Sequence, residues 1–186
     1  MAEQSPSTRI HGSSPERLLR IISGGQTGVD RAALDAALSV GISCGGWCPA
    51  GRRAEDGVIP LNYPLRELPG GGYDDRTHKN VEDSDATLVV IFGRASGGTA
   101  RTIEFCRQLG RPHLVVDAAI VPLDEAVRRA LQFVTETDLR RLNIAGPRAS
   151  GEPRAYAYAY ALVRDLCLRC TPSPNPGPSR AQPSSA

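Results

Sequence analysis

The chain has almost no lysine: Lys79 is the only one, although lysine and arginine together number 22 among 186 residues. A Schiff-base or lysine-nucleophile mechanism therefore has a single candidate residue. Arginine suits bidentate contacts with oxyanions, but a genome rich in G and C explains the arginine content as simply, and we favour that explanation. The formal net charge of +2 is too small to indicate nucleic acid or an anionic membrane as a partner.

Long apolar runs are also missing. No run approaches the roughly 20 residues that a membrane-spanning helix needs. Residues 1–16 lack the apolar region of a signal peptide. We therefore expect a cytoplasmic protein without a membrane partner, in which the five cysteines stay reduced.

The cysteines and histidines form no recognisable metal or catalytic motif. The pairs Cys44–Cys48 and Cys167–Cys170 are spaced like metal ligands, but a structural zinc site needs about four ligands and no matching pair accompanies either. The three histidines stand apart in the sequence with no obvious partner. We therefore assign neither a metal site nor a catalytic residue, and interpret the cysteines as ordinary thiols.

The length allows one domain with a hydrophobic core and leaves little room for a second. Residues 1–15 and 171–186 are polar and contain serine and proline, a composition typical of disordered tails. We therefore predict a single ligand-binding domain over residues 16–170.

That domain begins with a strand, a glycine turn and a helix. An apolar run at 18–22 leads into the turn Ser23–Gly28, and apolar residues then recur at helical spacing over 30–38. Glycines let a backbone pass close to a ligand, and the free N–H groups of a helix start suit a phosphate. Neither G-x-G-x-x-G nor the P-loop pattern is present, so a turn that merely packs tightly is an equal alternative.

The rest of the chain continues the alternation of strands and helices. We predict further strands over residues 41–49, 63–68, 86–92, 113–116 and 141–145, and further helices over residues 76–84, 99–109, 123–135 and 156–168. Such alternation is typical of an α/β, Rossmann-like fold: a doubly wound, mostly parallel sheet with helices on both faces.

Three loops should meet at the carboxyl edge of this sheet, where open α/β folds bind ligands. These are the glycine turns at 24–28 and 94–99 and the loop at 146–150. Two turns that run into helix starts can together hold a phosphorylated ligand. Hydroxyl and guanidinium donors are available in Thr27, Ser96, Thr99, Arg53, Arg76 and Arg148.

Six sequence blocks, in matching order, resemble the molybdenum carrier (molybdenum cofactor carrier protein) family. That family belongs to a Rossmann-like superfamily that also includes the lonely-guy phosphoribohydrolases. The blocks are residues 21–38, 45–60, 76–81, 83–93, 96–105 and 142–150, so that the resemblance covers nearly all of the predicted domain.

The resemblance implies a homo-oligomeric carrier or storage protein that binds the molybdenum cofactor, a phosphorylated pterin, and delivers it to molybdoenzymes. It places the cofactor where the two glycine turns meet. The candidate binding residues are Gly24, Gly25, Gln26, Thr27, Gly28, Ser96, Gly97, Gly98 and Thr99, together with Arg53 and Arg76.

Two rival functions share these features. One is a nucleoside-monophosphate phosphoribohydrolase like the lonely-guy enzymes, whose turn carries a glutamate three residues after its threonine. Here Glu104 falls five residues after Thr99, which rotates its carboxylate by about 200° on a helix, although Asp30, Glu55 or Asp56 could reach the same edge. The other is a nucleotide-sensing module without catalysis. We lean away from an enzyme.

Overall fold

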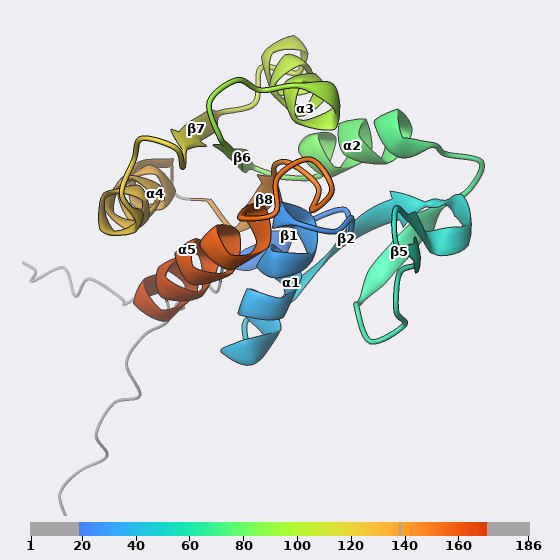
Figure 1. The fold of residues 1–186 in the computed structure, drawn as a ribbon, viewed down its shortest axis with the longest axis horizontal. Coiled ribbons are helices and arrows are strands. Elements are labelled where there is room, and N and C mark those ends of the chain that lie inside the picture. Colours follow the sequence, from blue (N-terminus) through green and yellow to red (C-terminus); the bar gives the residue numbers. More distant parts are fainter. Residues whose placement is uncertain (1–18, 138, 171–186) are drawn as a thin grey trace, which may run out of the picture.

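The computed structural model describes residues 19–137 and 139–170, and the predicted tails lie outside the described residues. Its main element is a six-stranded sheet in the order β5-β2-β1-β8-β6-β7, with every neighbouring pair parallel (Figure 1). The strands are β1 Arg20–Ile22, β2 Cys44–Pro49, β5 Leu65–Leu68, β6 Ala86–Ile91, β7 His113–Asp117 and β8 Arg141–Ala145.

Helices cover both faces of the sheet (Figure 1). One face carries α1 Val29–Ser39, α4 Leu123–Thr137 and α5 Ala155–Cys170, with α5 packed against the other two. The opposite face carries α2 Tyr73–Glu82 and α3 Gly97–Gln108, which pack against each other. The predicted doubly wound α/β fold is therefore confirmed.

The last strand of the sheet lies at its centre. β8 pairs with β1, with Leu142 opposite Ile21, and also with β6, with Leu142 opposite Ala86. The chain therefore winds outward from β1 to β5, crosses to β6 and β7, and returns to fill the position between β1 and β6. The residues that follow β1, β8 and β6 are brought together at one edge.

The core depends on small residues in α1. Ala33 and Ala37 of α1 and Ala155 and Ala159 of α5 are all fully buried, which lets the two helix backbones approach closely. Branched side chains of the strands fill the layer beneath, because strands buried on both faces favour such residues. The fully buried members are Ile21, Leu88, Val89, Val90, Leu142 and Ile144.

The segment between β2 and β5 is held by one arginine. After a short 3-10 turn, Ala50–Arg52, it forms the antiparallel pair β3 Arg53–Ala54 and β4 Gly57–Val58. The buried Arg52 guanidinium donates to the carbonyl oxygens of Ile59, Leu65, Pro60 and Tyr63, at 2.9, 3.1, 2.8 and 3.1 Å. The carbonyls of Pro60 and Tyr63 also accept backbone N–H groups, so the guanidinium adds a second bond to each of them and fastens the irregular segment to the start of β5.

Burial raises the pKa of the described cysteines and so disfavours their thiolate forms. Cys44, Cys48, Cys106 and Cys167 are buried and Cys170 is half-buried, and none of these five forms a disulfide. Burial raises the pKa of Cys167 to about 12. Among the described residues, no group of three His, Cys, Asp or Glu side chains could hold a metal ion. In the same part of the chain, no helix is long and apolar enough to cross a membrane.

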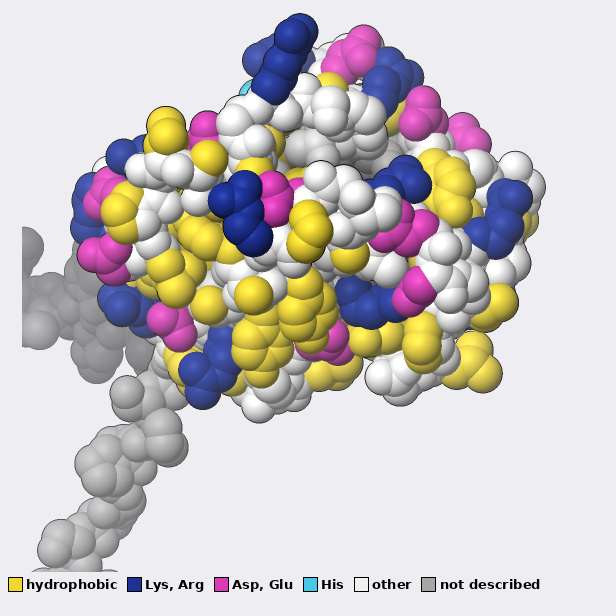
Figure 2. Space-filling view, viewed as in Figure 1, with side chains coloured by type: hydrophobic (Ala, Val, Ile, Leu, Met, Phe, Trp, Pro, Cys, Tyr) yellow, Lys and Arg dark blue, Asp and Glu magenta, His cyan; other side chains and the backbone are white. Residues whose placement is uncertain are grey.

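The visible surface carries mixed charge. Figure 2 shows Lys and Arg side chains interspersed with Asp and Glu side chains, without a broad patch of either sign on that face. Hydrophobic side chains gather over α1 and the neighbouring part of α5 in the same view, where Leu38 is 44% exposed and Tyr156 40% exposed.

Asp85 ties the start of β8 to the start of β6. One carboxylate oxygen accepts from the backbone N–H groups of Arg140 and Arg141 at 2.9 and 2.8 Å, and the other accepts from the Arg141 guanidinium at 3.0 Å. Partial burial acts to raise the pKa of Asp85, but these hydrogen bonds outweigh it and hold the pKa below its usual value.

We expect Asp85→Asn to destabilise the protein at pH 7 by about 1–2 kcal/mol, because charge-assisted hydrogen bonds are lost. A lowered pKa stabilises the fold above about pH 4, and this contribution disappears as the pH falls through the pKa of the folded state. Urea unfolding at stepwise lower pH should therefore show that the free energies of unfolding of wild type and variant converge. Asp165→Asn, at a side chain that is 42% exposed, is the control. A difference in unfolding free energy between wild type and Asp85→Asn that does not change with pH would contradict this role of Asp85.

Candidate functional site

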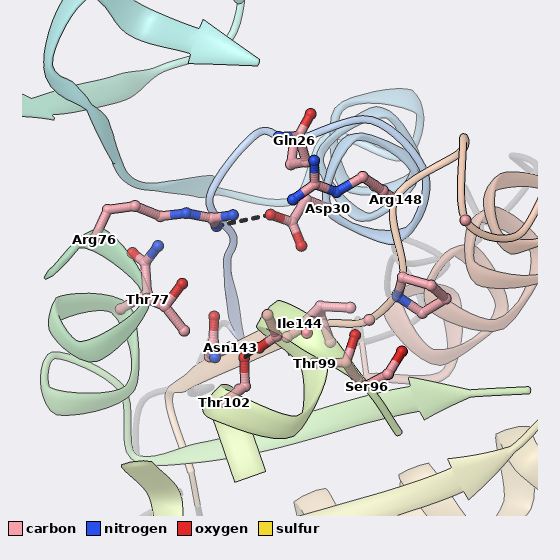
Figure 3. Close-up of a pocket in the computed structure, with 17 residues that line it drawn as sticks. Gln26, Asp30, Arg76, Thr77, Ser96, Thr99, Thr102, Asn143, Ile144 and Arg148 are labelled. Carbon is pink, nitrogen blue, oxygen red and sulfur yellow. Dashed lines mark hydrogen bonds and ion pairs between the residues drawn. The ribbon is translucent and has the colours of Figure 1, made fainter. Parts of the chain in front are cut away.

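A polar pocket of about 250 Å³ opens at the carboxyl edge of the sheet. Figure 3 shows its walls, which come from the start of α1, one face of α2, the start of α3 and the exit of β8. The polar side chains that line it are Gln26, Asp30, Arg76, Thr77, Asn80, Ser96, Thr99, Thr102, Asn143 and Arg148. The pocket lies where the chain changes direction in the sheet, with α1 on one face and α2 and α3 on the other, a position at which open α/β folds bind ligands.

The start of α3 is open toward the pocket. A side chain placed on Gly97 or Gly98 would meet no atom within 4 Å, and Gly97 has a φ of +51°. The hydroxyl of Ser96, which precedes the helix, makes no capping hydrogen bond. The backbone N–H of Thr99 bonds to the Ser96 carbonyl at 3.1 Å, so the N–H groups of the two glycines are the helix-start donors left for an oxyanion.

The first glycine turn, in contrast, is filled from within the protein. A side chain on Gly28, whose φ is +74°, would lie 2.4 Å from the Pro147 carbonyl oxygen. A side chain on Gly25 would meet Leu65 at 2.4 Å. Tight packing therefore explains these glycines without a ligand.

Gly24 makes room for an ion pair. The Arg76 guanidinium lies where its side chain would be, with Nη1 1.4 Å from the Cβ position. Arg76 Nη1 then contacts the Asp30 carboxylate at 2.8 Å, and the two side chains are only 13% and 6% exposed. This pair connects α2 to the first turn of α1 along one wall of the pocket (Figure 3).

Gln26 brings an unused donor to the pocket wall. Its side-chain oxygen accepts from the backbone N–H groups of Thr27 and Glu55 at 3.0 and 2.9 Å. Its amide nitrogen is buried and has no hydrogen-bond partner, although the residue is 6% exposed and lines the pocket. An unpaired buried donor costs free energy, and a ligand acceptor in the pocket would remove that cost.

Glu55 joins three loops beside the pocket. Its carboxylate accepts from the hydroxyl of Thr27 and from the backbone N–H of Ser150, the latter at 3.1 Å. Burial acts to raise the pKa of Glu55, but hydrogen bonds from Ser150 and Thr27 outweigh it and lower the pKa. Arg148 lies 3.8 Å from this carboxylate and is 49% exposed, so its guanidinium can turn toward a ligand at the pocket.

The predicted binding residues divide into two groups. The pocket is lined by Gln26, Arg76, Ser96, Gly97, Gly98 and Thr99. The hydroxyl of Thr27 bonds to Glu55 instead, and Arg53 is exposed and donates to the Ala50 carbonyl at 3.1 Å, outside the pocket. Gly24, Gly25 and Gly28 shape the turn as described above. Ligand contact at each predicted position stays a prediction.

Several lining residues were not predicted from the sequence. Thr77 and Asn80 share a face of α2 with Arg76, and Thr102 lies one turn after Thr99 on α3. Asn143 is 3% exposed and stands between the apolar residues Leu142 and Ile144 of β8. Two features of the sequence could have indicated these lining residues. One is an amide side chain between apolar residues of a strand, and the other is a helix start with few apolar positions.

Glu104 does not reach the pocket. Its side chain is 48% exposed, pairs with Arg101 and accepts from Gln108 at 3.0 Å. Among the described residues, the carboxylate that lines the pocket is that of Asp30. The turn after β6 thus lacks the carboxylate that a lonely-guy enzyme uses, in agreement with the helical spacing.

The fold and pocket define a Rossmann-like α/β protein with a polar, phosphate-compatible site at the carboxyl edge of its sheet. Residues 21–167 match the circularly permutated YpsA SLOG family, and the chain belongs to that family. The crystal structure of a "Putative molybdenum carrier protein" from Syntrophus aciditrophicus SB is 42% identical, with a TM-score of 0.79; the match covers 81% of this chain and 96% of that one. The resemblance to the molybdenum carrier family is thereby confirmed.

A more distant similarity joins the chain to a larger protein. It is 29% identical over 160 residues to a "Putative DNA processing protein DprA" of Mycobacterium tuberculosis, in both strain CDC 1551 and strain H37Rv. The match covers 75% of this chain and 41% of the relative, so the chain spans about two fifths of the length of these curated relatives.

Replacement of a glycine by alanine should have opposite effects on stability in the two glycine turns. We expect Gly28→Ala to destabilise the fold by about 2 kcal/mol or more, because its φ is positive and backbone atoms occupy the added position. Gly98→Ala should keep or slightly raise the stability, by up to about 1 kcal/mol, because alanine favours a helix. Thermal unfolding of both variants checks this; equal losses would contradict the difference between the turns.

Proposed function

We propose that this protein binds a phosphorylated small molecule in the carboxyl-edge pocket, with the start of α3 holding the phosphate. The observation that carries the proposal is the open space beside Gly97 and Gly98. Two backbone N–H groups, the hydroxyls of Ser96 and Thr99 and the positive end of the helix dipole converge there. No packing contact of either glycine accounts for that opening.

The charges of the pocket support an anionic ligand. Asp30 and Arg76 neutralise each other in their ion pair. Arg148 adds a positive charge whose nearest carboxylate contact is 3.8 Å long, beyond ordinary hydrogen-bond distance. A ligand phosphate could therefore recruit its guanidinium in a charge-assisted contact.

The remaining walls suit a polar heterocycle. Asn143, Thr77, Thr102 and the unpaired Gln26 amide offer both donors and acceptors. A pterin or a nucleobase presents N–H and C=O groups of matching kinds. No Cys or His lines the pocket, so these residues would hold the organic part and phosphate of a metal-containing ligand.

Of such ligands we propose the molybdenum cofactor, carried or stored for delivery to molybdoenzymes. The name of the Syntrophus relative and its similarity along 81% of this chain support this choice. We further propose a cytoplasmic homo-oligomer without a membrane or nucleic-acid partner. The hydrophobic side chains over α1 and α5, Leu38 and Tyr156 among them, offer a surface for a second copy.

A phosphoribohydrolase-like activity is the rival function, and Asp30 is the observation that favours it. Its carboxylate lines the pocket and is 6% exposed in its side chain. If the protein were an enzyme, Asp30 would be the acid nearest the ligand. Asp30→Asn should then abolish release of the base from a nucleoside monophosphate.

Native mass spectrometry of protein made in a host that synthesises molybdenum cofactor, with metal analysis, tests the carrier proposal. We expect a pterin phosphate with near-stoichiometric molybdenum. Gly98→Asp should lose it, because a carboxylate would repel the phosphate, while Glu104→Gln, outside the pocket, should retain it. A nucleotide in place of the pterin, lost in Gly98→Asp and therefore bound in the carboxyl-edge pocket, would contradict the carrier in favour of a sensor. Hydrolysis of AMP that depends on Asp30 would favour the enzyme.

Arg148→Gln should weaken binding of the phosphorylated ligand about tenfold and make it less dependent on salt, because one charge-assisted contact is removed. Isothermal titration at two salt concentrations measures both effects. Arg128→Gln, on α4 and 65% exposed, is the matched control. Unchanged affinity in Arg148→Gln would exclude Arg148 as a ligand contact.

A further inference from the structure

A second hollow, which we call the Trp47 hollow, lies on the α2 face of the sheet. It has a volume of about 370 Å³, and none of its lining residues belongs to the carboxyl-edge pocket. It extends toward the edge where β1 and β8 begin. The residues that line it are Arg20, Ile22, Gly46, Trp47, Arg66, Asp83 and Arg141.

Three arginines gather in this hollow although the chain has a net charge of only +2. Arg20 and Arg141 lie opposite each other on neighbouring parallel strands, a like-charge arrangement that is unfavourable by itself. Arg141 is compensated by Asp85 at 3.0 Å. Among the described residues, the Arg20 guanidinium donates to the Cys44 carbonyl, at 3.3 Å, and to no carboxylate.

Arg66 adds a second cation, close enough to Asp83 to interact with its carboxylate electrostatically but in no ion pair with it. Its guanidinium stacks over the Trp47 ring, 4.2 Å from the ring centroid. Among the described residues, no carboxylate forms an ion pair with Arg20 or Arg66. The acid of the hollow, Asp83, is paired with Lys79 at 3.1 Å, and Lys79 also pairs with Glu82 at 2.7 Å. With Asp85 on Arg141, three acids stand against the four cations in and around the hollow, which leaves an excess of one positive charge.

The Trp47 ring is held in place from several sides. Its indole N–H donates to Asp83 at 2.7 Å. Its backbone N–H and carbonyl are bonded to the Asn80 side chain at 2.8 and 2.9 Å. The indole therefore forms a fixed, flat wall, and a ligand that stacks there would lose little side-chain entropy from the protein.

We propose that the Trp47 hollow is a binding site for a small aromatic anion of the mononucleotide class. Its planar ring stacks against the wall made by Trp47 and Arg66, and its phosphate pairs with Arg20. Stacking of bases on aromatic and guanidinium planes and charge-assisted pairing with phosphate are the contacts that this set of side chains offers. The volume falls in the range of small-molecule sites, roughly 300–1,000 Å³.

A small ligand fits the hollow better than a nucleic-acid strand does. A strand needs a basic groove along several nucleotides, whereas the hollow is lined by a single aromatic side chain and includes the acid Asp83 among its arginines. The unpaired cations of the hollow, Arg20 and Arg66, flank a single tryptophan. That arrangement provides one stacking position and one phosphate position.

Trp47 is the only tryptophan of the chain, so its fluorescence, excited at 295 nm, reports directly on the hollow. We expect AMP or GMP, added to the full chain, to quench this fluorescence in a saturable way. Arg20→Gln and Arg66→Gln should each weaken the apparent affinity at least fivefold while the circular dichroism spectrum is unchanged. Arg128→Gln, on the exposed face of α4, should leave the affinity unchanged.

A second arm separates this site from the carboxyl-edge pocket. Gly98→Asp, which blocks that pocket, should leave the quenching intact. Loss of quenching in Gly98→Asp would assign the signal to the carboxyl-edge pocket and overturn the proposal. Unchanged affinity in both Arg20→Gln and Arg66→Gln, or no quenching by either nucleotide, would overturn it as well. Failure of the carrier proposal leaves the outcomes for Arg20→Gln and Arg66→Gln unaffected, because neither residue lines the carboxyl-edge pocket.

Discussion

The carboxyl-edge pocket depends on the ion pair between Arg76 and Asp30, which occupies the space where a side chain on Gly24 would lie. Arg76 reaches from α2 across Gly24 to Asp30 at the first turn of α1. Both charges are nearly buried, and breaking such a pair would leave an uncompensated charge in a low-dielectric wall. This contact therefore links the first glycine turn, α2 and one side of the pocket. Helices from opposite faces of the sheet are joined by it at the carboxyl edge.

The two glycine turns consequently have different roles despite similar sequences. The turn at 24–28 is closed by Arg76, Leu65 and Pro147 and acts as a rigid joint. The turn at 96–99 has free space beside its glycines and keeps its donors for a ligand. A rigid joint beside an open helix start gives a preorganised site, in which little has to be ordered when a ligand binds.

Sequence periodicity predicted the alternation of elements, because buried parallel strands and amphipathic helices leave clear patterns. The central position of β8 was not predictable in this way, since strand order depends on contacts between residues far apart, such as Ile21 and Leu142. If β8 and α5 stood before β1 in the sequence, the chain would start at the central strand, continue outward to β5 on one side and then run through β6 to β7 on the other. This is the ordinary order of a doubly wound sheet, and the circularly permutated family implies such a rearrangement. Asn143 and Asn80 were not predicted as lining residues, because their neighbours in the sequence do not reveal which face of the strand or helix lines the pocket.

The placement of β8 also has a consequence for how the protein is made. A ribosome delivers β1, β2 and β5 first and β6 and β7 next, and these form two half-sheets with no strand between them. The inner edges of both, β1 and β6, stay open until β8 emerges more than a hundred residues after β1. Such late, long-range pairing slows folding and exposes strand edges to aggregation. The edges of β1 and β6 are therefore protected only once the last strand has been inserted.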